Sequence, residues 1–142
     1  MGIIKGAISE AFERIADLFR PRAKIMINPS EVIVQREKAI YLDYKLQPGF
    51  ERKTFYKAEE IEGDFLLTTE RLTFISDQQL EYFNVFPEAV KEFTIISKNE
   101  IQLSIKKNDE EKKHSLRVSS PEKWRSNLQG IIHGRTGKYT FV

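Results

Sequence analysis

The residue types that most often bind metals or carry catalysis are scarce in this sequence. It contains two histidines, His114 and His133, and no cysteine. A zinc site would need further ligands, and nucleophilic catalysis would need a nucleophile within reach of a base. His114 lies in a basic stretch expected to form a hairpin, and His133 lies near the end of an expected helix, where a cation suits the helix dipole. We therefore predict surface or helix-capping roles for both histidines, and we expect no metal or other cofactor.

Two other patterns look catalytic only at first sight. The run from Gly134 to Lys138 lacks the long gap between glycines, and the Ser or Thr after the lysine, that a phosphate-binding loop needs. The second pattern is an acidic cluster, which is typical of a solvated strand edge rather than of a catalytic pair. Its members are Glu59, Glu60, Glu62 and Asp64. The sequence therefore predicts that the protein is not an enzyme.

Basic side chains are more informative about binding. One group with a surplus of positive charge surrounds the turn signal Gln47-Pro48-Gly49 and includes an aromatic residue at the turn. Lysine and arginine suit phosphate oxygens and attract anionic membranes. The predicted lipid-binding residues are Lys45, Phe50, Arg52, Lys53 and Lys57. A second group, partly offset by carboxylates, consists of Lys106, Lys107, Lys112, Lys113 and Arg117. An ordinary solvated surface is the alternative interpretation of both groups.

Composition narrows the class of protein further. The chain has 142 residues, and 23 Lys and Arg against 21 Asp and Glu give a net charge of +2, too balanced for an obvious nucleic-acid-binding protein. This length suits one domain with its own hydrophobic core. No apolar run approaches the roughly 20 residues of a membrane-spanning helix. The absence of cysteine excludes disulfides, so we expect a cytoplasmic location, either free or peripheral on the cytosolic face of a membrane.

The beginning of the chain has the pattern of an amphipathic helix. Its apolar stripe consists of Ile4, Ile8, Phe12, Ile15 and Phe19. This spacing predicts a helix over about residues 3–20, and a basic connector extends the segment to residue 24. The stripe suits docking on the domain or on a partner, and it also suits a membrane interface.

From Glu31 onward, short β-rich runs replace the helical pattern. Ile101, Leu103 and Ile105 alternate with polar residues, as in a half-buried strand. The runs predict about seven closely spaced antiparallel strands, which would form two packed sheets or a partly open barrel.

A second helix is expected to close the domain. Ser120 is a candidate N-cap, and Pro121 suits the first helical position. Trp124 and Leu128 lie on its apolar face, and Gly134 is a candidate C-cap. A helix with a large aromatic residue can plug the open end of a barrel, so Trp124 is predicted to be a core residue. Residues 134–142 form the expected C-terminal tail.

One segment resembles a known superfamily. The run from Gly63 to Phe74, GDFLLTTERLTF, is similar to the strand pair G-x-L-x-L-T-x-x-R-L-x-F of GRAM, GLUE and bacterial pleckstrin-homology-like domains. Seven strands and a closing helix with Trp124 also fit the pleckstrin-homology pattern. The run from Glu31 to Tyr41 resembles the start of a GLUE domain, the module of the second ESCRT complex. We expect Arg71, within this element, to pair with a carboxylate in a structural role.

The resemblance implies a fold, a domain range and a function. The expected fold is mainly β: a seven-stranded, partly open pleckstrin-homology-like barrel over residues 31–133, closed by a C-terminal helix. A GLUE domain would be an adaptor that binds ubiquitin and phosphoinositides in membrane sorting. Its ubiquitin surface would need apolar residues on a late strand and the last helix, for which the candidates are Phe93, Ile95, Ile96 and Leu128. The alternative is a bacterial or viral protein of this fold that self-assembles or docks on a membrane complex through its N-terminal helix.

Overall fold

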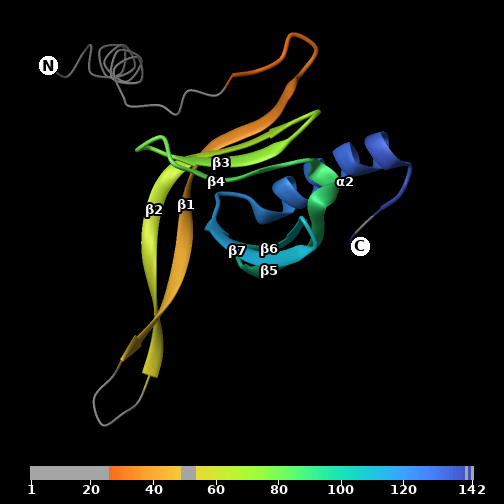
Figure 1. Cartoon of the computed structure of the whole chain (residues 1–142). Helices are drawn as coiled ribbons and strands as arrows, with labels where there is room; N and C mark the ends of the chain where they lie inside the picture. The colour runs from red at the N-terminus through yellow and green to blue at the C-terminus, as the bar shows by residue number, and fades with distance from the viewer. Residues whose placement is uncertain (1–25, 49–53, 140, 142) are drawn as a thin grey trace, which may run out of the picture.

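A computed structural model of the chain describes residues 26–48, 54–139 and 141 (Figure 1). The predicted N-terminal helix and the tip of the first hairpin, residues 49–53, lie outside the described residues. Within them, seven strands form one antiparallel sheet in the order β4-β3-β2-β1-β7-β6-β5, followed by one long helix, α2. The strands are β1 (Ile33–Pro48), β2 (Thr54–Thr68), β3 (Leu72–Ser76), β4 (Glu81–Val85), β5 (Val90–Ser97), β6 (Glu100–Lys107) and β7 (Glu110–Arg117). The expected fold class is confirmed.

Alternation along the strands sets the inner face of the sheet. On β6, Ile101, Leu103 and Ile105 are buried, as their spacing predicts, because every second side chain of a strand points to the same face. A short 3-10 helix, η2 (Pro87–Ala89), connects β4 to β5. This connection carries the chain from one end of the sheet order to the other, so that β4 and β5 are the two edge strands.

The β1–β2 hairpin is longer than the neighbouring strands with which it pairs. β1 pairs with β2 along its length, but its register with β7 covers only Ile40 to Leu42. β3 pairs with β2 only from Gly63 onward. The outer part of the β1–β2 hairpin therefore extends beyond the other strands as a two-stranded arm (Figure 1).

The helix α2 (Pro121–Thr136) closes the core. It begins after Ser120, and Pro121 occupies its first turn, as the sequence predicts. Its C-cap is Gly137, whose φ of 74° lies in the left-handed region that glycine adopts most easily. The predicted C-cap, Gly134, is instead inside the helix, so the helix runs one turn further than expected.

The buried face of α2 completes a single hydrophobic core. Trp124, Leu128 and Ile132 are each at most 1% exposed, and the indole ring of Trp124 stacks on the Phe65 ring with centroids 4.0 Å apart. The predicted core position of Trp124 is confirmed. Beyond the helix, Phe141 is also buried and stacks on Phe93 of β5. In the described part of the chain, no helix is sufficiently long and apolar to cross a bilayer.

Candidate functional site

The corner between β2 and β3 is held by an ion pair. The Nε and Nη2 atoms of Arg71 lie 2.8 and 3.0 Å from the two carboxylate oxygens of Glu31, whose side chain is fully buried. Thr68 also donates its hydroxyl to Glu31, and the backbone N–H of Asn28 donates to the same carboxylate. Burial raises the pKa of Glu31, but the hydrogen bonds from Arg71, Thr68 and Asn28 more than offset this, so the pKa lies below its ordinary 4.5. The predicted pairing of Arg71 with a carboxylate is confirmed.

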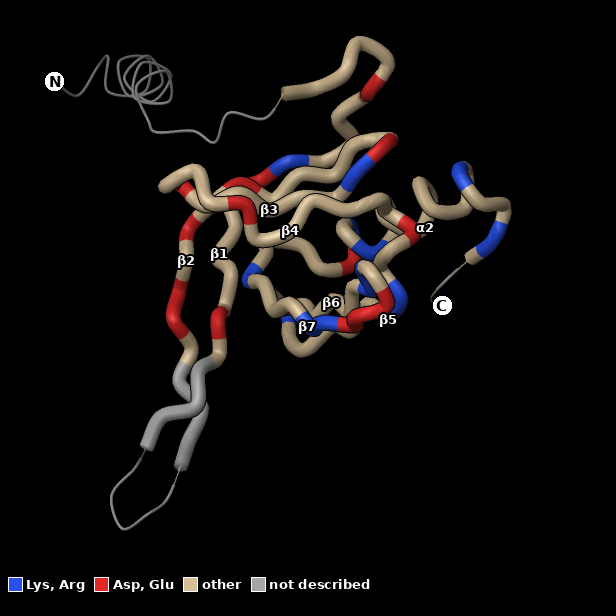
Figure 2. The backbone as a smooth tube through the Cα atoms, in the orientation of Figure 1, with Lys and Arg blue, Asp and Glu red and all other residues tan. Residues whose placement is uncertain are grey.

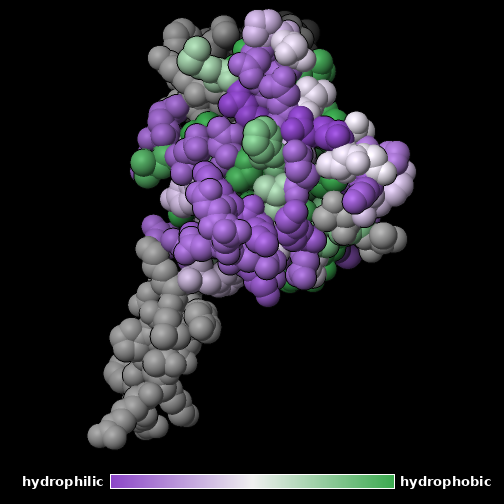
Figure 3. Space-filling model, turned by 45° about the vertical axis from the view of Figure 1, so that its right-hand side comes forward, coloured by the Kyte–Doolittle hydropathy of each residue, from purple (hydrophilic) through white to green (hydrophobic). Residues whose placement is uncertain are grey.

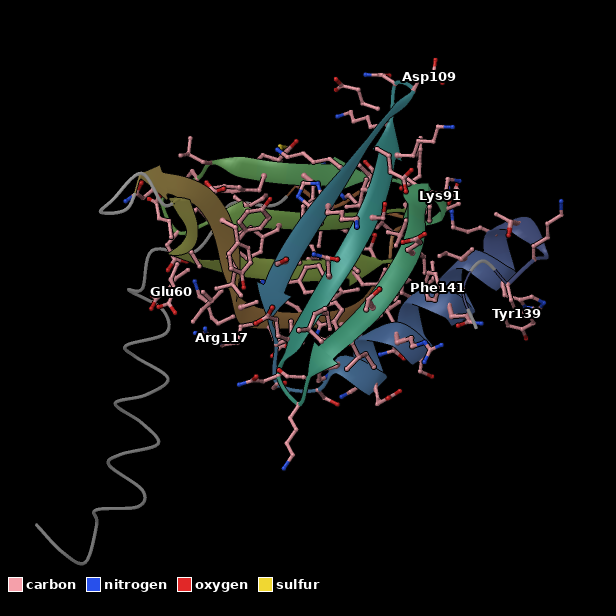
Figure 4. The ribbon with its side chains drawn as sticks, turned by 90° about the horizontal axis from the view of Figure 1, so that it is seen from below. Glu60, Lys91, Asp109, Arg117, Tyr139 and Phe141 are labelled. Atoms are coloured by element: carbon pink, nitrogen blue, oxygen red, sulfur yellow. The ribbon has the colours of Figure 1, made fainter. Side chains whose placement is uncertain are left out.

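The acidic cluster divides into a solvated part and a buried part. Glu60 is exposed and pairs with Arg117 at 2.9 Å, and both side chains lie at the edge of the barrel (Figure 4). Asp64 is only 3% exposed and lies 3.5 Å from Arg36 and 3.6 Å from Lys38. The prediction of a solvated edge is therefore wrong for Asp64, because the neighbouring strand β1 supplies cations across the sheet.

His114 is a core residue, contrary to the prediction of a surface role. Its side chain is 4% exposed, and its Nδ1 lies 2.7 Å from the hydroxyl of Tyr41 on β1. Burial, with a smaller contribution from nearby Lys112, lowers the pKa of His114 from 6.5 to about 4. Burial likewise raises the pKa of Tyr41 to about 12. At neutral pH the pair is therefore uncharged and structural. His133 is exposed and stacks on Tyr139.

His114 should make folding stability depend on pH. Between its ordinary pKa of 6.5 and its folded value of about 4, the unfolded chain binds more protons than the folded protein. Its contribution to stability is thus complete above pH 6.5 and is lost as the pH falls toward 4, by up to about 3 kcal/mol. We expect His114→Gln, which keeps a polar partner for Tyr41, to flatten this dependence in urea unfolding between about pH 7 and about pH 5. Equal pH dependence of both proteins would contradict the assignment.

Two of the five predicted lipid-binding residues lie in the described part of the arm. Lys45 and Lys57 are directly opposite each other in the register of β1 and β2. Phe50, Arg52 and Lys53 lie outside the described residues. The strands therefore bring the backbones of two of the five predicted residues together.

The predicted ubiquitin-binding residues do not form one exposed surface. Leu128 is 1% exposed and Phe93 is 9% exposed, and both belong to the hydrophobic core. Ile95 is half-buried, whereas Ile96 is 51% exposed. Leu128 and Phe93 are therefore unavailable to a partner in this structure, and Ile96 is the one exposed member of the set.

A hollow that the sequence did not indicate lies beside β4. It has a volume of about 510 Å³. Its apolar lining comes from Val85, Phe86 and Ala89, and its polar lining comes from Asn28, Glu70, Arg71, Asn84, Lys106, Lys107 and Asn108. A smaller hollow of about 200 Å³ shares Val85, Lys107 and Asn108 with it. We call the two together the seam groove, because they border one another between β4 and the β6–β7 hairpin. On the face turned forward in Figure 3, a small apolar area is framed by hydrophilic residues.

The polar groups around the seam groove differ in how far they are already paired. Arg71 is held by Glu31, and Glu70 accepts hydrogen bonds from Asn28 and Ser30. By contrast, Lys106, Lys107 and the Asn84 amide have no side-chain hydrogen bond or ion pair within the described residues. Blocks of basic and acidic residues adjoin one another around the β6–β7 turn (Figure 2). The groove thus combines an apolar lining with hydrogen-bonding groups that are free to meet a ligand.

Phe86 gives the groove an exposed aromatic ring. It is 65% exposed, and the guanidinium of Arg135 lies over the ring at 5.5 Å from its centroid. Arg135 is also paired with Glu88 on η2, with its Nε 2.8 Å from the carboxylate. The side chain of Arg135 therefore fixes one face of the ring and leaves the rest of it accessible.

Comparisons with known proteins do not assign a family. Neither a protein-family profile nor a curated protein matches the sequence. Among solved structures, the Ran-binding domain of the nuclear pore complex component NUP2 from Ashbya gossypii is similar over 72% of this chain and 94% of that chain, with 17% sequence identity and a TM-score of 0.41. Both values are too low to transfer a function. Among the described residues, no group of three or more His, Cys, Asp or Glu side chains is placed to hold a metal ion.

Proposed function

We propose that the protein is a noncatalytic binding module that holds a segment of a partner protein in the seam groove. The proposal rests on one observation: the exposed aromatic ring of Phe86 and two unpaired cations, Lys106 and Lys107, line the same hollow. Exposed apolar surface with a polar surround is typical of protein interaction sites. A ligand would cover the ring and neutralise the ammonium groups.

The side chains with catalytic potential support a binding role rather than an enzymatic one. His114 is buried against Tyr41, and its lowered pKa keeps it neutral. Glu31 and Asp64 are buried beside cations. These contacts leave the groups in structural roles, although His114 also lines the smaller hollow of the seam groove beside Lys107 and Lys112.

The lining of the groove defines the chemistry of the partner segment. An apolar anchor side chain would pack on Phe86 and Ala89, and nearby carboxylates would face Lys106 and Lys107. Ubiquitin, which a GLUE-like domain would bind, is one candidate partner, and it would be expected to use the exposed Ile96 on β5 instead. The groove and Ile96 are separate surfaces, so one measurement can distinguish them.

Anionic lipid headgroups are a second candidate ligand, at the arm. The register places the backbones of Lys45 and Lys57 directly opposite each other. Lysine side chains suit phosphate oxygens, and anionic membranes attract each nearby lysine by about 1 kcal/mol. The arm extends beyond the barrel, so it can approach a membrane before the other strands do (Figure 1).

Amide chemical-shift mapping on the full chain tests these alternatives together. We expect an acidic peptide with one aromatic anchor to shift the amides of Phe86, Ala89 and Lys107, and Phe86→Ala to weaken this binding about tenfold. Shifts confined to Ile96 on addition of ubiquitin would favour the GLUE-like alternative. Loss of amide signals from the arm on addition of anionic vesicles, but not of neutral ones, would favour lipid binding. This loss should become smaller as salt is added. Absence of any shift around the groove would overturn the main proposal.

A further inference from the structure

The two edges of the sheet are protected to different degrees. β5 is one edge strand, and Phe141, which follows α2 in the chain, packs against its Phe93 beside α2 (Figure 4). β4 is the other edge strand, and the seam groove lies next to it. An edge strand presents a row of unpaired backbone N–H and C=O groups, which can pair with another extended segment. Among the described residues, the backbone of β4 pairs with β3 alone, so its other edge is open to an added strand.

Together the two hollows of the seam groove are lined by β4 from Tyr82 to Val85. Tyr82 and Phe83 line the smaller hollow, Asn84 lines the larger one, and Val85 lines both. Five residues of strand span about 17 Å, enough to pair with a short extended segment. The two hollows thus lie beside four consecutive residues of β4, with which an extended peptide could pair.

The wall opposite β4 is basic. The β6–β7 hairpin contributes Lys106 and Lys107 to one hollow, and Lys107 and Lys112 to the other. The lining carboxylates are Glu70, which already accepts two hydrogen bonds, and Glu110, which stands opposite Lys107 in the register of β6 and β7. Among the described residues these three lysines form no ion pair. The wall therefore favours a segment that carries carboxylates.

We propose that the partner segment is extended and acidic, and that it joins the open edge of β4 as an eighth strand. This inference rests on the proposed function, because it specifies how the same groove is filled. Main-chain hydrogen bonds to β4 would supply affinity, and carboxylates at alternate positions would face the lysines of the β6–β7 hairpin. The free amide of Asn84 would add a hydrogen bond beside the strand.

A partner is a better occupant of this edge than a second copy of the chain. Pairing two β4 strands would bring the lysines of two β6–β7 hairpins together at one interface, where like charges cost several kcal/mol. β4 is also only five residues long, and short edge strands limit indiscriminate pairing. Both features favour an acidic segment of a partner protein over a second copy of the chain as the strand that pairs with β4.

Two peptides of identical composition test strand addition. The first peptide has about nine residues, within the usual range of strand lengths, and alternates Glu with Val around a central Phe. The second peptide carries the same residues arranged as one acidic block and one apolar block. We expect the alternating peptide to bind the full chain about tenfold more tightly than the block peptide in a chemical-shift titration. Amide exchange in β4 should slow about tenfold when the alternating peptide is bound, because its edge N–H groups become hydrogen-bonded.

Charge variants provide the matched control. Lys107→Glu with Lys112→Glu should weaken the alternating peptide about tenfold, whereas Lys98→Glu with Lys123→Glu, the same charge change at exposed sites outside the groove, should not. Equal binding of the two peptides, or groove shifts without slower exchange in β4, would overturn strand addition and leave the proposed binding function in place. Failure of the alternating peptide to bind at millimolar concentration would also overturn it.

Discussion

Trp124→Ala is expected to lower the free energy of unfolding by about 3–5 kcal/mol. The indole ring is 1% exposed and stacks on Phe65, so its removal leaves a large cavity beneath α2. The ring N–H also donates to the carboxylate of Glu37 on β1, which accepts the backbone N–H of Ser119 just before the helix. The substitution therefore removes both core volume and a contact that anchors the start of α2 on the sheet.

Two variants separate these effects in urea unfolding. Trp124→Phe keeps most of the aromatic volume but loses the donor to Glu37, so we expect it to cost less than half as much as Trp124→Ala. Phe86→Ala, at a ring that is 65% exposed, should change stability by less than about 0.5 kcal/mol. A Trp124→Ala midpoint close to that of the wild type would show that the ring is not part of the core.

Local patterns predicted the individual strands and the closing helix, whereas the choice of a partly open barrel rested on the resemblance. The alternation of Ile101, Leu103 and Ile105 identified a strand, and Ser120-Pro121 identified the start of α2. These signals depend only on neighbours in the sequence, so the buried face of the strand and the first turn of the helix follow from them directly. The end of α2 was harder to locate, since Gly134 and Gly137 are equally suitable in sequence and only the backbone φ of Gly137 distinguishes them.

Residues whose role depends on distant strands could not be assigned from the sequence. His114 contacts Tyr41, 73 positions earlier in the chain, because β1 and β7 are neighbouring strands of the sheet. Asp64 is buried because β1 places Arg36 and Lys38 beside it. Charge patterning along one strand describes only that strand, and it cannot show which cations a neighbouring strand supplies.

The seam groove has no sequence signature for the same reason. Its lining comes from the β2–β3 corner, the end of β4, η2 and the β6–β7 hairpin, which are separate in the chain. The sequence did identify Lys106 and Lys107 as members of a basic group, but not as the wall of a groove. Phe86 could not be distinguished from the core aromatics, because its exposure depends on where η2 turns the chain away from β4.

Arg71→Ala is expected to cost about 3–5 kcal/mol, more than Glu31→Ala, although the two substitutions break the same ion pair. The reason is the difference in burial: the side chain of Glu31 is 0% exposed, whereas that of Arg71 is 21% exposed. Removing Arg71 leaves a carboxylate without its cation in the protein interior, with only Thr68 and the Asn28 backbone to stabilise its charge. Removing Glu31 leaves a guanidinium that water can reach.

Unfolding experiments on both single variants and the double variant, at neutral and acidic pH, measure this asymmetry. The double variant should be less destabilised than the sum of the two single variants, because neither unpaired charge remains. The pKa of Glu31 lies below 4.5 in the folded protein, so its contribution is present above that value and is lost as the pH falls. In Arg71→Ala, protonation instead relieves the buried charge, so its stability should approach that of the wild type in acid. The ion pair would be shown not to hold the corner by two results together. The effects of the two single variants would add up in the double variant, and the stability difference between Arg71→Ala and the wild type would not change with pH.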